Sequence, residues 1–366
     1  MNSPRLLAAA ILSLSTLPAQ DILHYKFEAG CGNEVVNYAV GAFGNGTLTT
    51  TLPSTSSPWT GGRWGNAMAG TTTSGQTYVT TGWNLGAFTG SFSVSMWIRN
   101  NTGNASTIGF GYLFGATGSN FRCFTGSSGK LFVSGWGGSQ NLVNANDLTT
   151  LLNAGFVHVA LVVDSTKATA TYYINGVADT PIALTGSVSF SGTDFSIGRY
   201  STSTPSPLDF DEFLFTRRVL TAAEVQLLAQ APQAGAGRYG TGNAGTLVPS
   251  GGRPSFGNVL FQMAISDSAS QSFLLFLGSN RCTIFGNVAL PIDLGKVIPQ
   301  FSGVNAYTDT NLARVVGALN AGGATLGLPV PNLPALAGYH LYWQAYTITS
   351  SNTLRGTNAV ALGLGI

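Results

Sequence analysis

Residues 208–228 read LDFDEFLFTRRVLTAAEVQLL and combine the pattern of a strand with the start signal of a helix. The run FDEFLF at 210–215 is rich in aromatic and aliphatic residues, which is typical of a buried strand. Thr221 and Glu224 then stand three residues apart at the start of an apolar helix pattern, which is the spacing of a capping box. We therefore expect a strand that leads into a short helix over 222–229.

The same segment concentrates charge in a chain that is only 8% charged. Along a strand, Asp209 and Asp211 share one face, whereas Glu212 points to the other. Apart from Glu212 on the opposite face, no further acid or histidine stands beside this pair in the sequence. Because an exposed ion pair contributes only about 0–1 kcal/mol, burial of Phe213 and Phe215 is expected to do more to hold the segment in place. We interpret the segment first as a structural closing element.

The rest of the chain indicates an all-β protein. It has 48 glycines, 11% aromatic residues and few charges, a composition typical of short strands and many turns. Asn175 and Gly176, after the run TATYYI, predict a tight hairpin turn. Strand-like runs, most of which alternate apolar and polar residues, recur at 22–27, 92–98, 130–136, 157–163, 169–174 and 210–215. This pattern favours an antiparallel sandwich with one buried face per strand.

The 366 residues are long enough for two modules. Residues 1–20, with Arg5 before a short apolar run, predict a secretory signal peptide, and no longer apolar run that would span a membrane follows. Residues 231–254 lose periodicity and fill with Gly, Pro and Ala, which predicts a linker or domain entrance. Residues 255–366 carry further short strands and predict a smaller β-sandwich-like module.

Three segments of the first module, in this order, resemble the laminin-G-like (LamG) jelly rolls of the concanavalin A-like lectin and glucanase group. GRWGNAM at 62–68 followed by FSVSMWIRN at 92–100 is similar to the opening of that family. HVALVVDSTKATATYYINGV at 158–177 resembles its central hairpin, and DFDEFLFTRRVLTAAEV at 209–225 its closing strand and helix. The resemblance covers about residues 21–230 and implies an antiparallel jelly-roll sandwich.

Jelly rolls of this group often hold one calcium ion, which takes oxygen ligands. Asp211 matches the Asp of the family's closing strand, so the resemblance makes it the first candidate ligand, with Glu28 or Asp209 assisting. Where many relatives carry acidic residues before the Tyr-Val strand, this chain has Gln76 and Thr77. Calcium is therefore a possible cofactor, held by Asp211 and Glu28.

Carbohydrate binding needs an aromatic face for stacking on sugar C–H groups and polar partners for the hydroxyls. Trp136 and Tyr200 stand at expected strand–loop junctions among Ser, Asn and Gln, so they are candidate ligand-binding residues, together with Asp209. The alternative, that both aromatic residues pack loop ends, stays open. Trp97, at an alternating apolar position, is expected in the core.

Several chemistries find little support in the sequence. The 16 Lys and Arg residues are scattered, which argues against a nucleic-acid partner. The Glu-x-Asp-x-x-Glu strand of the related glucanases is missing, and the three histidines stand in separate runs without a partner at zinc-ligand spacing. Of the three cysteines, Cys31 and Cys123 lie in the same half and are the favoured pair, which would leave Cys282 free.

The sequence thus predicts a secreted or cell-surface protein that is not an enzyme. Its LamG-like module is expected to serve recognition or adhesion, with an extracellular glycan or a surface protein as the partner. One alternative is a structural or surface-attachment protein of an extracellular assembly, without a small-molecule ligand. A glycoside hydrolase whose carboxylates converge only in three dimensions is the third and weakest alternative.

Overall fold

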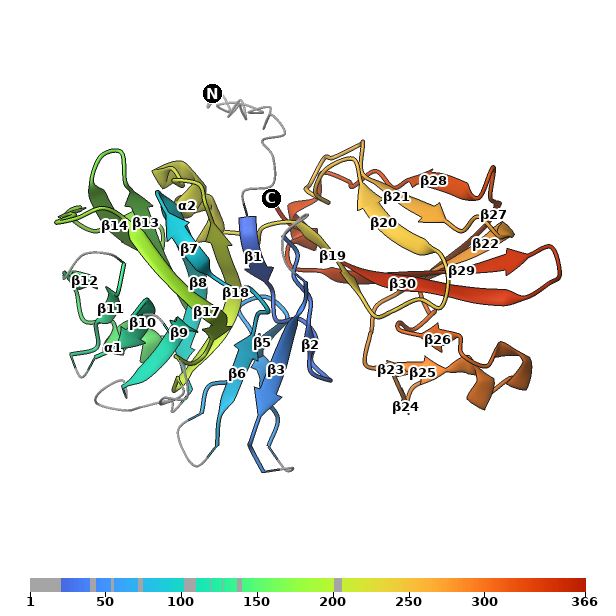
Figure 1. Ribbon diagram of the computed structural model, residues 1–366, viewed down its shortest axis with the longest axis horizontal. Coiled ribbons are helices and arrows are strands. Elements are labelled where there is room, and N and C mark those ends of the chain that lie inside the picture. The colour runs from blue at the N-terminus through green and yellow to red at the C-terminus, as the bar shows by residue number, and fades with distance from the viewer. Residues whose placement is uncertain are drawn as a thin grey trace, which may run out of the picture.

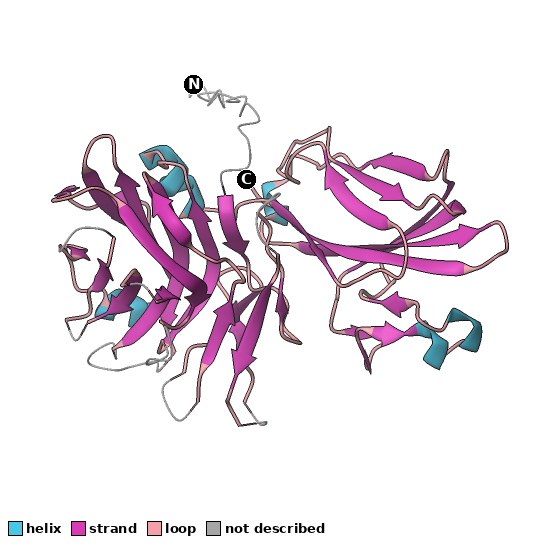
Figure 2. Ribbon diagram, in the orientation of Figure 1, coloured by secondary structure: helices cyan, strands magenta, loops and turns pink. Residues whose placement is uncertain are grey.

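The structure is a computed structural model that describes residues 21–39, 44–53, 56–71, 75–101, 110–118, 120–126, 128–136, 140–200 and 206–366. The expected signal peptide, residues 1–20, lies outside the described residues. The chain forms two β-rich lobes that lie side by side (Figure 1). Nearly all regular structure is strand, with a few short helices at the edges (Figure 2). Both observations confirm the predicted all-β class.

The N-terminal lobe is a sandwich of two antiparallel sheets. The first sheet has the order β15 (Val177–Ala178), β14 (Thr169–Ile174), β13 (Val157–Asp164), β8 (Phe92–Asn100), β18 (Leu208–Thr216), β5 (Asn66–Met68) and β4 (Trp59–Gly61), with β1 (Asp21–Tyr25) on β18 and β16 (Ile182–Ala183) on β14. The second has the order β12 (Leu142–Val143), β11 (Leu131–Ser134), β10 (Arg122–Thr125), β9 (Gly111–Thr117), β17 (Ser189–Ile197), β6 (Thr77–Thr80), β3 (Gly46–Thr50) and β2 (Glu34–Val35), with β7 (Gly86–Thr89) on β17.

Aromatic side chains from both sheets fill the space between them. Phe215 of β18 stacks on Phe92 of β8 with ring centroids 5.4 Å apart, and Phe121 stacks on Phe190 at 3.9 Å. Phe213 and Phe215 are fully buried, as the sequence predicted. The hairpin between β14 and β15 also turns at Asn175, which has a φ of 51°.

The closing strand leads into its capped helix as expected. Helix α2 (Ala222–Leu228) begins after Thr221, whose Oγ1 accepts a hydrogen bond from Glu224 N at 3.2 Å, while Glu224 Oε2 accepts one from Thr221 N at 2.8 Å. Leu220 and Val225 are buried against β13 and β18. The second α-helix, α1 (Thr149–Ala154), lies between β12 and β13 in the sequence.

The C-terminal lobe is a smaller sandwich. Its five-stranded sheet has the order β19 (Gly235–Tyr239), β30 (Leu354–Gly363), β29 (His340–Thr349), β22 (Ser270–Gly278) and β27 (Ala313–Ala318), and its three-stranded sheet β20 (Thr246–Ser250), β21 (Gln262–Ser266) and β28 (Gly323–Gly327). Two two-stranded sheets and three 3-10 helices complete it: β23 (Thr283–Ile284) with β24 (Val288–Ala289), β25 (Ile292–Asp293) with β26 (Asn305–Ala306), η1 (Leu294–Lys296), η2 (Pro299–Phe301) and η3 (Pro334–Leu336).

The segment 231–254, expected as a linker, contains β19 and β20 and so belongs largely to the second lobe. Its small residues serve close packing. A Cβ atom on Gly235 would lie 2.8 Å from Tyr38 Cβ, so only glycine lets β19 lie this close to the first lobe. At Gly235 the small residue therefore serves the close approach of β19 to the first lobe.

The two lobes are joined by a disulfide, and the expected cysteine pairing was wrong. Cys31 is bonded to Cys282, with their Cα atoms 5.7 Å apart, whereas Cys123 is a free, buried thiol. Cys123, on β10, is buried in the core of the first lobe, whereas Cys31 lies in the segment after β1 and is bonded to the second lobe. Proximity in the sequence did not reflect proximity in space.

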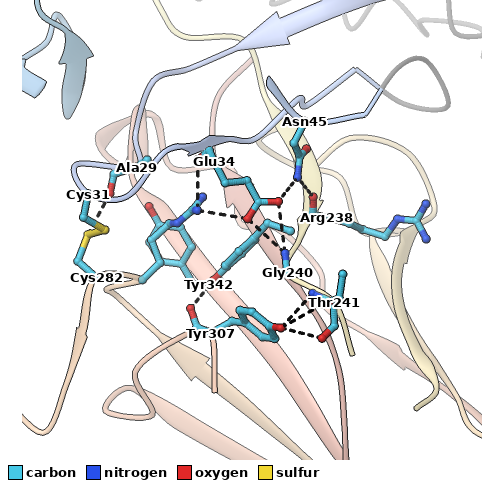
Figure 3. A network of polar contacts seen from close by, with 12 residues as sticks. Ala29, Cys31, Glu34, Asn45, Arg238, Gly240, Thr241, Cys282, Tyr307 and Tyr342 are labelled. Atoms are coloured by element: carbon cyan, nitrogen blue, oxygen red, sulfur yellow. Dashed lines mark hydrogen bonds and ion pairs between the residues drawn. A yellow bond between two sulfur atoms is a disulfide. The ribbon is translucent and has the colours of Figure 1, made fainter. Parts of the chain in front are cut away.

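A network of polar contacts between the two lobes lies beside this disulfide (Figure 3). Glu34 Oε2 lies 3.8 Å from Arg281 Nη2. Asn45 Nδ2 donates hydrogen bonds to Glu34 Oε1 at 2.7 Å and to the Arg238 carbonyl at 2.8 Å. A buried cluster joins residues of both lobes: Val36, Tyr38, Tyr239, Tyr307, Tyr342, Ala359 and Ala361. The lobes are therefore packed as one unit. Among the described residues, no helix has the length and apolar character needed to cross a membrane.

Candidate functional site

A row of aromatic side chains lies on the outer face of the second sheet. Phe132 of β11 is paired with Phe124 of β10, which is in turn paired with Tyr112 of β9. The residues that alternate with them, among them Leu113 and Val133, are buried in the core. Because successive strand residues point to opposite faces, the three rings point outward, and each is half-buried.

Two further rings extend this row. Tyr200 lies 5.2 Å from Tyr112 between ring centroids, and Phe110, which is 49% exposed, lies 5.7 Å from Phe124. Phe124 and Phe132 are parallel to within 8° at 5.2 Å. We call these five residues the aromatic face: Phe110, Tyr112, Phe124, Phe132 and Tyr200. It provides a contiguous set of rings on three neighbouring strands, the residue before β9 and the segment after β17.

The position of Tyr200 depends on a glycine beneath it. A Cβ atom on Gly115 of β9 would lie 2.6 Å from Tyr200 Cδ2, so a larger residue there would displace the ring. On this face, Arg122 lies over the Tyr200 ring at 5.1 Å, and Arg199 lies over Tyr78 of β6 at 3.5 Å. Both contacts are in the range of cation–π interactions. The aromatic face is thus bordered by two cations.

A second cluster lies buried beneath the junction of the two lobes. Glu28, Asp211 and Glu212 each offer a carboxylate oxygen, and these atoms lie within 4.8 Å of one another. Asp211 and Glu212 were expected on opposite strand faces. β18 has an irregular register between Asp211 and Leu214, and Glu212 adopts a φ of 49°. This bulge brings both carboxylates to one site.

Backbone and lysine donors satisfy most of the carboxylate oxygens. Asp211 Oδ2 accepts hydrogen bonds from the amides of Arg63 and Trp64 at 2.7 and 3.1 Å. Glu28 Oε2 accepts one from the amide of Asn66 at 2.8 Å. Both oxygens of Glu212 lie 2.8 Å from Lys26 Nζ. The turn GRWGN therefore cradles two carboxylates, and a Cβ atom on Gly62 or Gly65 would overlap them.

Two buried oxygens in this cluster have no hydrogen-bond partner among the described residues: Glu28 Oε1 and Asp211 Oδ1. Burial, and then the neighbouring carboxylates, raise the pKa values of Glu28 and Asp211 well above the ordinary range. Burial also opposes ionisation of Glu212, but the Lys26 ammonium holds the pKa of that carboxyl below its ordinary value. Two carboxylates are thus left without a compensating charge.

These residues fit a divalent cation. When all three carboxylates are ionised, one lysine leaves two negative charges in excess, which is the charge that a calcium ion would neutralise. The partnerless oxygens are of the hard donor type that calcium prefers. Burial keeps His340 neutral, with its pKa lowered to about 3, so this histidine adds no positive charge at neutral pH.

The second lobe covers the cluster. His340 Nδ1 of β29 lies 3.7 Å from Glu28 Oε1, and the Tyr342 hydroxyl donates a hydrogen bond to the Glu28 carbonyl at 3.3 Å. From the first lobe, His24 Nε2 lies 3.5 Å from Glu212 Oε2. Histidines from separate sequence runs therefore meet at one site, which the sequence did not indicate.

Comparison with known proteins agrees with this architecture. Residues 72–226 match the family model Laminin_G_3, described as the concanavalin A-like lectin/glucanases superfamily. This part of the N-terminal lobe is thus similar to that superfamily. The resemblance seen in the sequence is thereby confirmed for this concanavalin A-like module. No curated protein matches the sequence.

Several solved structures are similar to the chain at low identity. The binding domain of Paraclostridial Mosquitocidal Protein 1 is 12% identical with a TM-score of 0.43, covering 68% of this chain and 64% of that one. The binding domain of Botulinum neurotoxin serotype D is 10% identical with a TM-score of 0.43, covering 94% and 92%. Domain 4 of AbnA, a GH43 arabinanase from Geobacillus stearothermophilus, is 22% identical with a TM-score of 0.38, covering 58% and 99%. Likenesses this distant carry no argument about function.

The three predicted ligand-binding residues do not form one site in the concanavalin A-like module. Tyr200 is part of the aromatic face. Trp136 is fully buried, and its Nε1 donates a hydrogen bond to the Gln140 carbonyl at 2.7 Å, so it packs a loop end as the alternative interpretation held. Asp209 is buried on the first sheet, where Arg99 Nη2 donates to its Oδ2 at 2.7 Å. Trp136 and Asp209 therefore have structural roles.

The predicted metal ligands, by contrast, do lie together. Asp211 and Glu28, 183 positions apart in sequence, lie in the same cluster, with Glu212 as an unexpected third member. The four aromatic partners of Tyr200 were missed, because aromatic residues in strands are usually interpreted as core. The alternation of Phe124 with Cys123, and of Phe132 with Val133, was the available signal.

Proposed function

We propose that the concanavalin A-like module is a non-catalytic recognition or adhesion module that binds glycan chains on its aromatic face. The observation that carries this proposal is the row of five partly exposed rings, three on neighbouring strands and two beside them. Aromatic rings in this arrangement offer apolar faces for the C–H groups of sugars, and the Tyr hydroxyls offer hydrogen bonds at the rim.

The extent of the aromatic face favours an oligosaccharide over a single sugar. Neighbouring strands lie about 4.8 Å apart, so the rings on β11, β10 and β9 alone extend over about 10 Å. Tyr200 continues the row beyond β9. Several sugar units of one chain can therefore contact the face at the same time.

Two observations support the wider setting of the proposal. The matched superfamily is described by its lectins and glucanases, so carbohydrate is the natural ligand class to test. The disulfide between Cys31 and Cys282 suits an oxidising compartment, which agrees with the expected secretory signal peptide and a secreted or cell-surface location. The buried carboxylate cluster is not open to a substrate, and so it gives no support to hydrolysis.

We further propose that Asp211 and Glu28, with Glu212, hold one structural calcium ion. The partnerless oxygens Glu28 Oε1 and Asp211 Oδ1 support this assignment. When bound, the ion would supply the two positive charges that the cluster lacks. The ion would tie β18 to the segment after β1 and to the turn before β5, at a distance from the aromatic face.

A glycan array probed with the full chain, in chelator and in calcium, tests the glycan proposal. The wild-type protein should bind at least one class of oligosaccharide, and Tyr200→Ala should raise Kd by about 2–10-fold. Phe285→Ala, which removes a 74% exposed ring from the second lobe, is the matched control and should leave Kd unchanged. No binding in either condition would exclude the proposal and favour the alternative of a structural or surface-attachment protein.

A further inference from the structure

Two arginines at the aromatic face differ from the other half-buried arginines of the protein. Within the described ranges, seven arginines are half-buried. Five of them lie within ion-pair distance of a carboxylate: Arg99 with Asp209, Arg218 with Glu224, Arg253 with Asp21, Arg281 with Glu34 and Arg355 with Asp267. The other two are Arg122 and Arg199.

Neither guanidinium group has a polar partner among the described residues. Arg122 Nε and Arg199 Nε are buried without a hydrogen bond, and no carboxylate of the described residues lies within ion-pair distance of either side chain. Their contacts are with aromatic rings: Tyr200 and Phe124 for Arg122, and Tyr78 for Arg199. The rings hold the two charges in place, but they leave the donors of both groups unused.

An unpaired cation that has lost part of its hydration is costly, so such sites are usually completed by an anion. A guanidinium group presents parallel N–H donors that match the oxygens of a carboxylate or a sulfate. Both arginines flank Tyr200, one by direct ring contact and the other by adjacency in the chain. The missing anion would therefore be contributed by whatever lies on the rings.

We propose that the ligand of the aromatic face is an anionic glycan, whose carboxylate or sulfate groups pair with Arg122 and Arg199 while its sugar rings stack on Tyr200 and its neighbours. This inference rests on the proposed glycan-binding function and specifies the ligand class. The face carries two cations and not an extended basic stripe, which favours a glycan with occasional charges over a nucleic acid with one charge per nucleotide.

Binding of matched oligosaccharides to the full chain tests the proposal. The probes are hexasaccharides of β-1,4-glucan, β-1,3-glucan and β-1,4-mannan, each in neutral, C6-oxidised and sulfated form, with oligo-dT as a polyanion of another class. The anionic form of at least one backbone should bind about tenfold more tightly than its neutral form. This preference should weaken in high salt. A preference for the oxidised or for the sulfated form identifies the group recognised.

The variants separate this inference from the proposed function. Arg122→Gln and Arg199→Gln should each remove most of the anionic preference and retain binding of the neutral form. Tyr200→Ala should weaken the binding of both forms. Arg314→Gln, which changes an exposed arginine on β27, should alter the binding of neither.

Equal binding of neutral and anionic forms overturns the inference but leaves glycan binding intact. Tighter binding of oligo-dT than of every glycan overturns both. Melting temperatures equal to wild type show that the Gln variants are folded, and Arg122→Lys should retain part of the preference through its charge.

Discussion

Cys31 and Cys282 form a disulfide that joins the two lobes across 251 positions of sequence. The bond lies at an interface that also contains the ion pair of Glu34 with Arg281 and a buried cluster of tyrosines. The lobes are consequently linked at both the chain connection and the disulfide. The second lobe acts as a cover for the buried carboxylates of the first, through His340 and Tyr342.

Removal of this disulfide should destabilise the protein. The double variant Cys31→Ser/Cys282→Ser is expected to lose about 2–4 kcal/mol of unfolding free energy, because the bond restricts the unfolded chain over a long loop. Urea unfolding of the oxidised wild type and the variant measures the difference. The native protein should also resist alkylation, since its free thiol at Cys123 is buried with a raised pKa. Rapid alkylation without denaturant would contradict the assigned pairing.

Calcium should stabilise the protein more as the pH rises. Without the ion, Glu28 and Asp211 have pKa values raised in the folded state, so the folded state binds more protons above the ordinary carboxyl pKa of about 4. In chelator, the free energy of unfolding should therefore fall as the pH rises from about 4 through the raised pKa values. Calcium binding to the ionised groups should offset this loss.

Melting curves across pH, in chelator and in calcium, measure this effect. Asp211→Asn combined with Glu28→Gln should flatten the pH dependence in chelator and abolish the response to calcium. Asp164→Asn, at a solvent-accessible carboxyl that caps a turn, is the control and should preserve the response. A wild-type protein with the same melting temperature in chelator and in calcium would refute the assigned ion.

Lys26 should be essential for the stability of the cluster. Its side chain is fully buried and contacts both oxygens of Glu212. Lys26→Met leaves that carboxylate without its cation and should cost about 3–5 kcal/mol. The double variant Lys26→Met/Glu212→Gln removes the unpaired charge and should recover part of the loss in urea unfolding. If the double variant is less stable than the single one, the pairing assigned to Glu212 is wrong.

Gly115→Ala should weaken glycan binding without removing any ring. The added methyl group would collide with the Tyr200 ring and displace it from the aromatic face. We expect a rise in Kd similar to that of Tyr200→Ala, measured on the best oligosaccharide from the array. Gly327→Ala, where nothing lies within 4 Å of the new Cβ atom, is the matched control. Unchanged binding by Gly115→Ala would show that Tyr200 does not contact the ligand.

Thr221→Ala tests the capping box of helix α2, which the sequence predicted. Loss of the side-chain acceptor leaves the amide of Glu224 without its cap, which should cost about 1 kcal/mol of unfolding free energy. Thr180→Ala, at an exposed position outside the helices and strands, should cost nothing measurable. Equal stability of both variants would mean that packing of Leu220 and Val225 alone holds α2.

Local patterns in the sequence were sufficient for the fold class and for several elements. The capping box at Thr221, the turn at Asn175 and the burial of Phe213 all depend on residues a few positions apart, so their signals are contained in short windows. The order of such windows also carried the resemblance to the superfamily whose model matches residues 72–226. The LamG resemblance further pointed to Asp211, with Glu28 or Asp209 as the assisting ligand, although no short pattern joins Asp211 to Glu28.

The sequence by itself thus determined an antiparallel β-sandwich with a capped closing helix, because alternation and capping are local properties. Only the tertiary structure decided the rest. The bulge at Glu212 turned two adjacent acids toward one site, and β29 of the second lobe brought His340 to it. The pairing of Cys31 with Cys282 and the assembly of the aromatic face likewise depend on which strands lie side by side. Strand order and lobe packing arise from long-range burial, which no short stretch of sequence encodes.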